Sequence, residues 1–151
     1  MKKSILFFAV IIIFAVSAQA QISNPATWSF TAKKLSGGKY ELHLTATLAN
    51  GWHVYSQKSS ANGPGPTTIT FNSNALVNTK GTVKEVGQLV KKYEEVFNTN
   101  VLFYEKKVDF IKTVTVKGNI KTNVSGNIQY TLCNDSKCLP PKTVDFSISL
   151  N

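Results

Sequence analysis

Apolar residues alternate with polar residues along several stretches of the chain, and this pattern constrains the fold more than any other feature. Every second residue is apolar in residues 40–48 and again in residues 144–150. Side chains two positions apart lie on the same face of a strand, so each stretch predicts a strand with one buried face. Weaker alternation around Trp28, Ile69 and Phe110 predicts further strands.

Short groups of turn-forming residues separate these stretches. They are Gly37-Gly38, Asn50-Gly51, Gly63-Pro64-Gly65-Pro66, Lys80-Gly81, Gly118-Asn119 and Ser125-Gly126-Asn127. Glycine and asparagine tolerate the backbone angles of tight turns, and proline restricts φ. Short alternating strands joined by such turns predict an all-β fold, most simply an immunoglobulin-like antiparallel β-sandwich.

One segment departs from the alternating pattern. Val86, Leu89, Val90, Tyr93 and Phe97 follow the spacing of one helical face. Periodicity alone leaves a short helix and an extended segment equally open here.

The amino terminus has the pattern of an export signal. Lys2 and Lys3 precede an apolar run over residues 5–16, which is short for a membrane span, and Ala18-Gln19-Ala20 offers small residues for cleavage. We expect residues 1–20 to be a signal peptide and residues 21–151 to form one domain, without stable membrane insertion after cleavage. The expected location is therefore an oxidising exported compartment.

The charge of the chain is positive but not organised for nucleic acid. The net charge is +9, every basic residue is a lysine, and no run of five basic residues occurs. Nucleic-acid-binding proteins commonly use arginine, whose planar fork matches phosphates and guanine edges. We therefore expect no nucleic-acid partner. The only histidines, His43 and His53, have no third ligand candidate at suitable spacing, so we expect no metal site either.

The two cysteines, Cys133 and Cys138, are close in the sequence and are followed by Leu139-Pro140-Pro141. Two thiols this near in an exported protein are expected to pair. A crosslink closing so small a loop would add only ~2 kcal/mol of stability by chain entropy. The bond could be a minor structural bridge in a non-catalytic binding or assembly module. The alternative is a redox-active bond, reachable by an incoming thiolate without unfolding the domain, although the spacing alone favours the structural bridge.

The segment from Tyr130 to Pro141 resembles the active-site hairpin of the N-terminal periplasmic domain of the bacterial thiol:disulfide interchange protein DsbD. The likeness extends to Asn50-Gly51-Trp52-His53-Val54-Tyr55, similar to the strand that places aromatic residues beside the cysteines. It also includes Tyr93-Glu94-Glu95-Val96-Phe97 and Phe103-Tyr104-Glu105, which resemble the cap loop and the strand after it. The spacer between the two cysteines is one residue shorter than in well-known members of that family.

The resemblance implies an immunoglobulin-like domain that carries reducing equivalents without a cofactor. Cys138 would form the mixed disulfide with partners, and Cys133 would resolve it. Phe97 would be the aromatic cap over the sulfurs, and Glu95 an acid that influences thiol ionisation. The surrounding wall would consist of Tyr55, Tyr104 and Tyr130. The resemblance also favours an extended strand and loop over residues 87–100 instead of a helix.

The same resemblance implies the partners. Full-length members of the family continue into a membrane domain and a thioredoxin-like domain. We therefore expect a separate membrane reductase as electron donor. The expected acceptors are periplasmic thioredoxin-like proteins or disulfide isomerases, including proteins of cytochrome c maturation.

Overall fold

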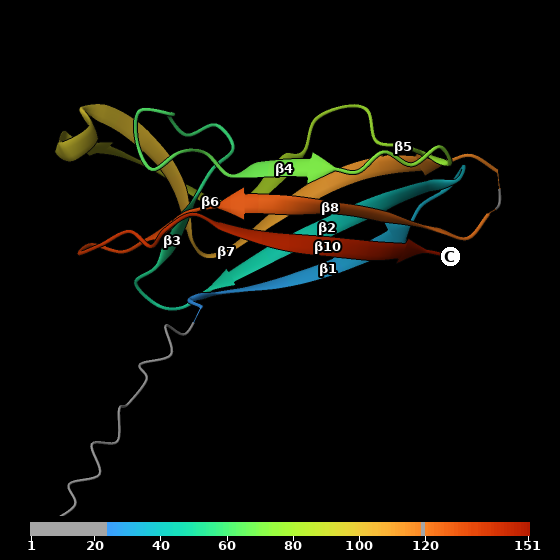
Figure 1. Cartoon of the computed structure of the whole chain (residues 1–151), viewed down its shortest axis with the longest axis horizontal. Coiled ribbons are helices and arrows are strands. Elements are labelled where there is room, and N and C mark those ends of the chain that lie inside the picture. Colours follow the sequence, from blue (N-terminus) through green and yellow to red (C-terminus); the bar gives the residue numbers. More distant parts are fainter. Residues whose placement is uncertain (1–23, 119) are drawn as a thin grey trace, which may run out of the picture.

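The computed structural model describes residues 24–118 and 120–151 and consists of two antiparallel sheets packed face to face (Figure 1). The larger sheet contains β1 (Ala26–Lys34), β2 (Lys39–Leu48), β3 (His53–Tyr55), β5 (Val77–Asn78), β6 (Lys84–Glu94), β7 (Thr99–Val116) and β9 (Leu132–Cys133). The smaller sheet contains β4 (Thr68–Phe71), β8 (Thr122–Tyr130) and β10 (Lys142–Leu150). This architecture confirms the predicted immunoglobulin-like antiparallel sandwich. The expected signal peptide lies outside the described residues.

The main core lies between the two sheets and is built by the alternating stretches. Leu42, Leu44 and Ala46 of β2 are fully buried, and Phe146 and Ile148 of β10 face them from the smaller sheet. Aromatic residues fill the remaining space: Trp28 packs against Phe30, Phe110 and Tyr130, and Phe146 packs against Phe30 and Phe71. Burial of these apolar side chains is the dominant favourable contribution to folding.

Strand β7 organises the larger sheet because it is long enough to pair with four other strands. One edge pairs with β3 and then β2, and the other edge pairs with β6 and β5. The register with β6 shifts between Gly87 and Leu89, opposite Lys106, whose φ is +61°. This irregularity divides β7 into two parts: residues 107–116 cover the main core, and residues 99–103 extend beyond it with β6. A bulge of this kind bends a strand and increases its twist.

The segment with helical spacing forms strand β6 and a single 3-10 turn, η1 (Glu95–Phe97). The extended conformation over this segment, implied by the resemblance, is confirmed. Val86, Leu89 and Tyr93 are exposed, whereas Val90 packs on a small group of buried residues next to β7. These residues therefore do not form the buried face of a helix, although their spacing matches one. Pairing with β7 over nearly the whole of β6 decides the local structure instead.

One predicted turn was wrong. Residues 125–127 lie within β8, where Gly126 pairs with Phe71 on one side and Phe146 on the other. A Cβ atom at Gly126 would lie 2.0 Å from the Thr70 carbonyl oxygen and 2.7 Å from the Phe146 ring. Glycine is required here by the close approach of the neighbouring strand, not by a turn.

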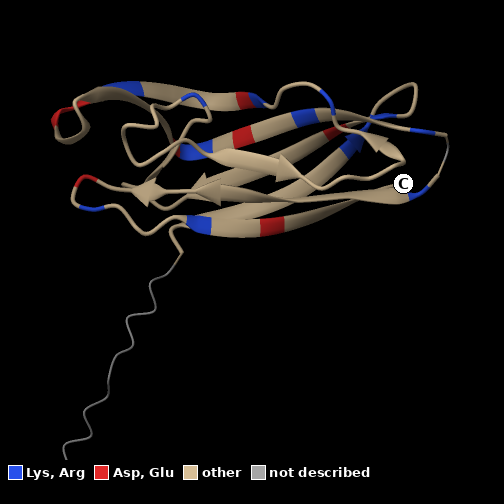
Figure 2. Ribbon diagram, turned by 45° about the horizontal axis from the view of Figure 1, so that its top comes forward, with Lys and Arg blue, Asp and Glu red and all other residues tan. Residues whose placement is uncertain are grey.

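Among the described residues, no helix has the length and apolar character needed to cross a membrane. In the described part of the chain, lysine residues occur on strands and in loops at both ends of the molecule (Figure 2). Two histidine–carboxylate contacts lie on β2 and β7, where His43 Nδ1 is 2.7 Å from Asp109 and His43 Nε2 is 3.2 Å from Glu41.

Candidate functional site

The cysteines lie on a short hairpin that passes from the smaller sheet to the larger one. After β8, the chain leaves the smaller sheet at Thr131 and forms β9, which pairs with β3 of the larger sheet. It turns over residues 134–137 and returns through Cys138 into β10. The hairpin therefore extends the β8–β10 pair over the edge of the larger sheet (Figure 1).

Local hydrogen bonds shape this turn tightly. The Asn134 N–H donates to the Lys137 carbonyl, and the Leu139 N–H donates to the Leu132 carbonyl, at 2.9 and 2.8 Å. The Asn134 side-chain oxygen accepts from the backbone N–H groups of Ser136 and Lys137. An asparagine that caps its own turn in this way holds the loop without support from distant residues. The cysteines at the base of the turn are joined by a disulfide bond.

Strand alternation places the disulfide on the outer face of the larger sheet. Leu132 points into the main core, and the next residue, Cys133, points to the opposite face. There Cys133 belongs to a second, small core with Tyr55, Val101 and Phe103, against which Val90 packs. Cys133 is 2% exposed, whereas Cys138 is exposed to solvent. One sulfur-bearing residue is therefore fixed by packing, and the other is accessible.

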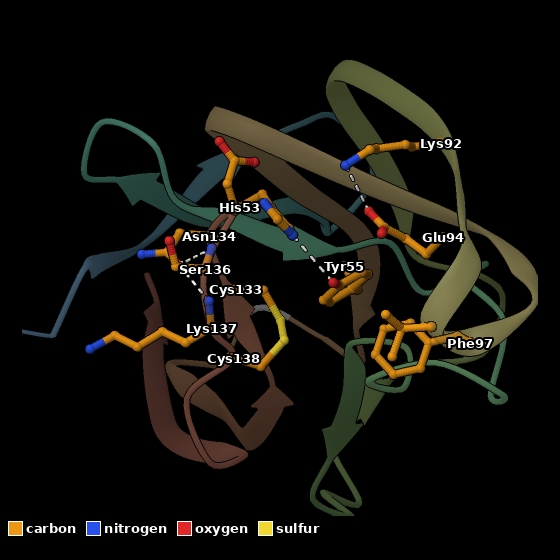
Figure 3. A pocket seen from close by; sticks show the side chains of 12 residues that line it. His53, Tyr55, Lys92, Glu94, Phe97, Cys133, Asn134, Ser136, Lys137 and Cys138 are labelled. Carbon is orange, nitrogen blue, oxygen red and sulfur yellow. Dashed lines mark hydrogen bonds and ion pairs between the residues drawn. A yellow bond between two sulfur atoms is a disulfide. The ribbon is translucent and has the colours of Figure 1, made fainter.

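A groove of about 250 Å³ runs between the cysteine hairpin and the end of the β6–β7 arm. It is lined by His53, Tyr55, Lys92, Glu94, Val96, Phe97 and the hairpin from Cys133 to Cys138. In Figure 3, Phe97 lies across the groove from the disulfide, and His53 and Tyr55 form the wall above and between them. The disulfide therefore forms one side of this groove, and Phe97 forms the side opposite to it.

Phe97 is held in place by η1 and by the glycine-proline loop. Asn98 ends η1 in the left-handed conformation, and its side-chain oxygen accepts a hydrogen bond from the Tyr93 hydroxyl. Phe97 Cδ2 would lie 3.8 Å from a Cβ atom at Gly63, so the ring packs against the loop that contains Gly63. The Thr131 hydroxyl donates to the Pro64 carbonyl in the same loop, at 3.2 Å. This loop thus supports both the cap residue and the start of the cysteine hairpin.

A partly buried carboxylate ties the loop after β3 to strand β6. Glu85 accepts hydrogen bonds from the Ser56 hydroxyl at 2.6 Å, the Gln57 backbone N–H at 2.6 Å and the Tyr104 hydroxyl at 2.9 Å. Burial, and then the hydrogen bond to Glu85, raise the pKa of the Tyr104 hydroxyl. Because these bonds join the loop after β3 to β6 and β7, they fix the base of the arm that carries Phe97.

The structure brings together only some of the residues that the sequence suggested for the wall. Cys133, Cys138, Phe97 and Tyr55 line the groove. Tyr104 and Tyr130 do not, because each side chain belongs to the main core on the other face of the larger sheet. Glu95 does not line the groove either. Its neighbour Glu94 does, and its carboxylate lies 2.9 Å from Lys92 Nζ.

Sequence reasoning did not assign His53 to the site. Its Cα is paired with that of Cys133 across the β3–β9 ladder, and its ring packs on Phe103 with centroids 4.3 Å apart. His53 Nε2 lies 3.2 Å from the Tyr55 hydroxyl oxygen. The available signal was the period of two in β3, which places residues 53 and 55 on one face.

Burial controls the titration of the groove's ring side chains. Burial lowers the pKa of His53, and the carboxylates of Glu105, Asp135 and Glu94 oppose this shift only in part. Burial, followed by the charge of Glu94, raises the pKa of Tyr55 to about 12. Both side chains are therefore uncharged near neutral pH. Lys92, Glu94, Asp135 and Lys137 place two positive and two negative charges around them.

The arrangement can perform thiol–disulfide exchange with the side chains it contains. Such exchange requires an accessible sulfur, a second sulfur within bonding distance and an incoming thiolate. No group of three histidine, cysteine, aspartate or glutamate side chains suited to a metal ion occurs in residues 24–118 or 120–151.

Comparison with known proteins agrees with this geometry. The family model of the N-terminal part of the thiol:disulfide interchange protein DsbD matches residues 18–150. The solved N-terminal domain of Neisseria meningitidis DsbD, in its reduced form, is 18% identical, with 73% of this chain and 77% of that chain covered and a TM-score of 0.52. No curated protein matches the chain.

Two further solved structures are similar. The N-terminal periplasmic domain of ScsB from Proteus mirabilis is 21% identical with a TM-score of 0.54, covering 84% of this chain and 46% of that chain. This chain thus spans about half the length of the ScsB domain. A structure of the complex between the DsbD and PilB N-terminal domains of Neisseria meningitidis has 15% identity and a TM-score of 0.47, covering 71% of this chain and 73% of that chain. At these identities the structural likeness concerns the fold.

Proposed function

Because the chain belongs to the family of DsbD N-terminal domains, we propose that it is a periplasmic thiol–disulfide exchange domain that carries reducing equivalents through Cys133 and Cys138. In its reduced form the domain would pass two electrons to oxidised exported proteins. A membrane reductase would return it to the dithiol state. The signal-like residues 1–20 support export of the domain formed by residues 21–151.

The difference in exposure between the two cysteines is the observation that carries this proposal. An exposed Cys138 suits attack on a partner's disulfide and formation of the mixed disulfide. The buried Cys133 suits the resolving step, in which it attacks Cys138 and releases the partner as a thiol. Oxidation of the domain's two thiols balances reduction of the partner's disulfide.

Phe97 has a protective role in this proposal. Its ring faces the disulfide across the groove and is carried by a single 3-10 turn at the end of the β6–β7 arm. Movement of that turn would expose the sulfurs to a partner without disturbing the main core. Thioredoxin-like proteins with an exposed Cys-x-x-Cys pair are the proposed class of partner.

Redox titration with a defined partner tests the proposal. The domain should equilibrate with a glutathione or dithiothreitol buffer while its circular dichroism spectrum stays native. The Cys133→Ala variant should accumulate a mixed disulfide with a purified oxidised thioredoxin-like protein, and Cys138→Ala should not. A folded domain whose disulfide resists these reductants, or a Cys133→Ala variant that forms no mixed disulfide, would contradict the proposal.

A further inference from the structure

The strand position of His53 gives it a relationship to Cys133 that the exchange chemistry described above does not use. The two residues are opposed in the β3–β9 ladder, so their side chains project from the same face with Cβ atoms about 5 Å apart. Both residues line the groove. His53 is therefore the titratable residue directly opposite Cys133 in this ladder.

The imidazole is held in one orientation. Its ring packs against Phe103, with centroids 4.3 Å apart, and meets the Tyr55 ring edge to face at 5.3 Å. The hydrogen bond between His53 Nε2 and the Tyr55 hydroxyl fixes the rotation of the ring. A ring held by two aromatic neighbours and a hydrogen bond can exchange a proton repeatedly in the same geometry.

Cys133 needs a proton acceptor when it acts. Only the thiolate is nucleophilic, and burial among apolar side chains disfavours the charged form of a thiol. Cys133 is surrounded by Tyr55, Val101 and Phe103, so its thiol in the reduced domain is expected to be protonated. A base beside it could remove the proton only as the sulfur attacks.

We infer that His53 is the general base of the resolving step, an inference that rests on the proposed exchange function. The Cys133 thiol gives its proton to His53 Nδ1 as its sulfur attacks Cys138 Sγ. The bond between Cys138 and the partner breaks, and its electron pair leaves on the partner's sulfur. The imidazolium, with Nε2–H donating to the Tyr55 oxygen, then loses the proton to solvent, and the departing thiolate takes one up.

The charges around His53 are compatible with this role. Carboxylates of three different elements favour the imidazolium once it forms, whereas burial and one lysine favour the neutral ring that must accept the proton. These groups are Glu105 of β7, Asp135 of the cysteine hairpin, and Glu94 and Lys92 of β6. The Tyr55 hydroxyl stays protonated because its pKa is about 12. His53 is therefore neutral before the step and stabilised after it.

A small aromatic disulfide separates the two steps experimentally. Dithiobis(nitrobenzoate) should react first with the exposed Cys138 of the reduced domain and release one coloured thiolate. The attack of Cys133 on the resulting mixed disulfide then releases a second. In stopped-flow measurements the first rate depends on reagent concentration and the second does not, so the second reports the resolving step alone.

The inference predicts the pH profile of that second step. In the native protein its rate should be constant above about pH 6.5 and fall at lower pH as His53 becomes protonated. In His53→Gln the rate should be about 100-fold lower near pH 7 and should increase with pH up to the pKa of the thiol. His53→Phe, which keeps the aromatic packing on Phe103, should behave like His53→Gln.

His43→Gln is the matched control, because His43 lies on β2 beside Asp109 and does not line the groove. It should retain the native profile. A His53→Gln variant with the native profile would overturn the inference while leaving the exchange function intact. Absence of the second release in the native protein would contradict the exchange function itself.

Discussion

Cys133 and Cys138 are bonded to each other, yet the first is buried in a small core and the second is open to solvent. The difference follows from their positions on the hairpin. Cys133 ends β9 and points into the group formed by Tyr55, Val101 and Phe103, whereas Cys138 lies on the exposed segment that leads back to β10. The two sulfurs of one bond therefore have different access to a partner.

Alkylation should reveal this difference after reduction. In the reduced domain, Cys138 should react with iodoacetamide at least about ten-fold faster than Cys133, because a buried thiol is both shielded and less ionised. Rates from the single-cysteine variants Cys133→Ala and Cys138→Ala, followed by mass spectrometry, measure the two sites separately. Unfolding in urea should make the rates similar. Equal rates in the folded domain would remove the structural basis for assigning different roles to the two cysteines.

Replacing both cysteines should leave the fold intact. The disulfide closes a loop whose ends are five residues apart, and the turn is already held by the hydrogen bonds of Asn134. We expect Cys133→Ser with Cys138→Ser to lower the free energy of unfolding by ~2–3 kcal/mol, measured by urea denaturation. The main core lies on the other face of the sheet, so the circular dichroism spectrum of the variant should match that of the native protein. A loss of folding would mean that the bond is structural.

Much of the sandwich could be predicted from the sequence, because alternation directly records which strand faces are buried. Residues 40–48 and 144–150 form the strands expected of them. The pattern failed where pairing or packing is decided by a distant strand. The sequence around Gly126 is typical of a turn, but glycine is needed there because the backbone of Thr70 in the neighbouring strand lies too close for a side chain. In β6, pairing with β7 overrides helical spacing.

The candidate site could be predicted only in part, for a related reason. The cysteine spacing and the resemblance identified Cys133, Cys138, Phe97 and Tyr55, which line the groove. The face on which each remaining residue lies depends on where the strands bend and change sheet. Tyr104 follows Phe103 and therefore faces the main core. His53 reaches Cys133 through a pairing between strands far apart in sequence, which no local pattern indicates.

Truncation of Phe97 should make the disulfide more reactive without greatly changing stability. The ring is half-buried across the groove from the sulfurs, so Phe97→Ala should remove shielding and increase the rate of reduction by dithiothreitol several-fold. Leu89→Ala, an exposed residue of β6 that does not line the groove, is the matched control. Unchanged reduction kinetics in Phe97→Ala, measured by thiol release, would contradict a capping role.

Removal of the Glu85 carboxylate should weaken the base of the arm. The Ser56 hydroxyl, the Gln57 N–H and the Tyr104 hydroxyl all donate to it, and Glu85→Ala would leave these donors without that acceptor. Loss of one partner of a buried hydrogen bond costs about 1–3 kcal/mol, and these bonds are partly buried, so the cost should lie toward the lower end of that range. We expect a destabilisation in this range by urea denaturation. Asp145→Ala, at an exposed position of β10, should change stability by less than about 0.5 kcal/mol.

The stability of the domain should depend on pH through His53. Burial lowers the pKa of His53 below the value of 6.5 expected in the unfolded chain. As the pH falls through that value, the unfolded state binds a proton before the folded state does, so the free energy of unfolding decreases until the folded pKa is passed. Above about pH 6.5 both states are neutral and this contribution disappears.

His53→Gln tests this dependence because glutamine does not titrate. The difference in unfolding free energy between the native protein and His53→Gln should be constant above about pH 7. Below about pH 6.5 it should shift in favour of the variant. Urea denaturation at a series of pH values measures this difference, and referring each protein to its own value at neutral pH removes the cost of lost packing on Phe103. If the difference stays constant throughout this range, His53 has the same pKa in the folded and unfolded states. The His53 side chain would then be charged at mildly acidic pH and could not accept the proton of Cys133 under those conditions.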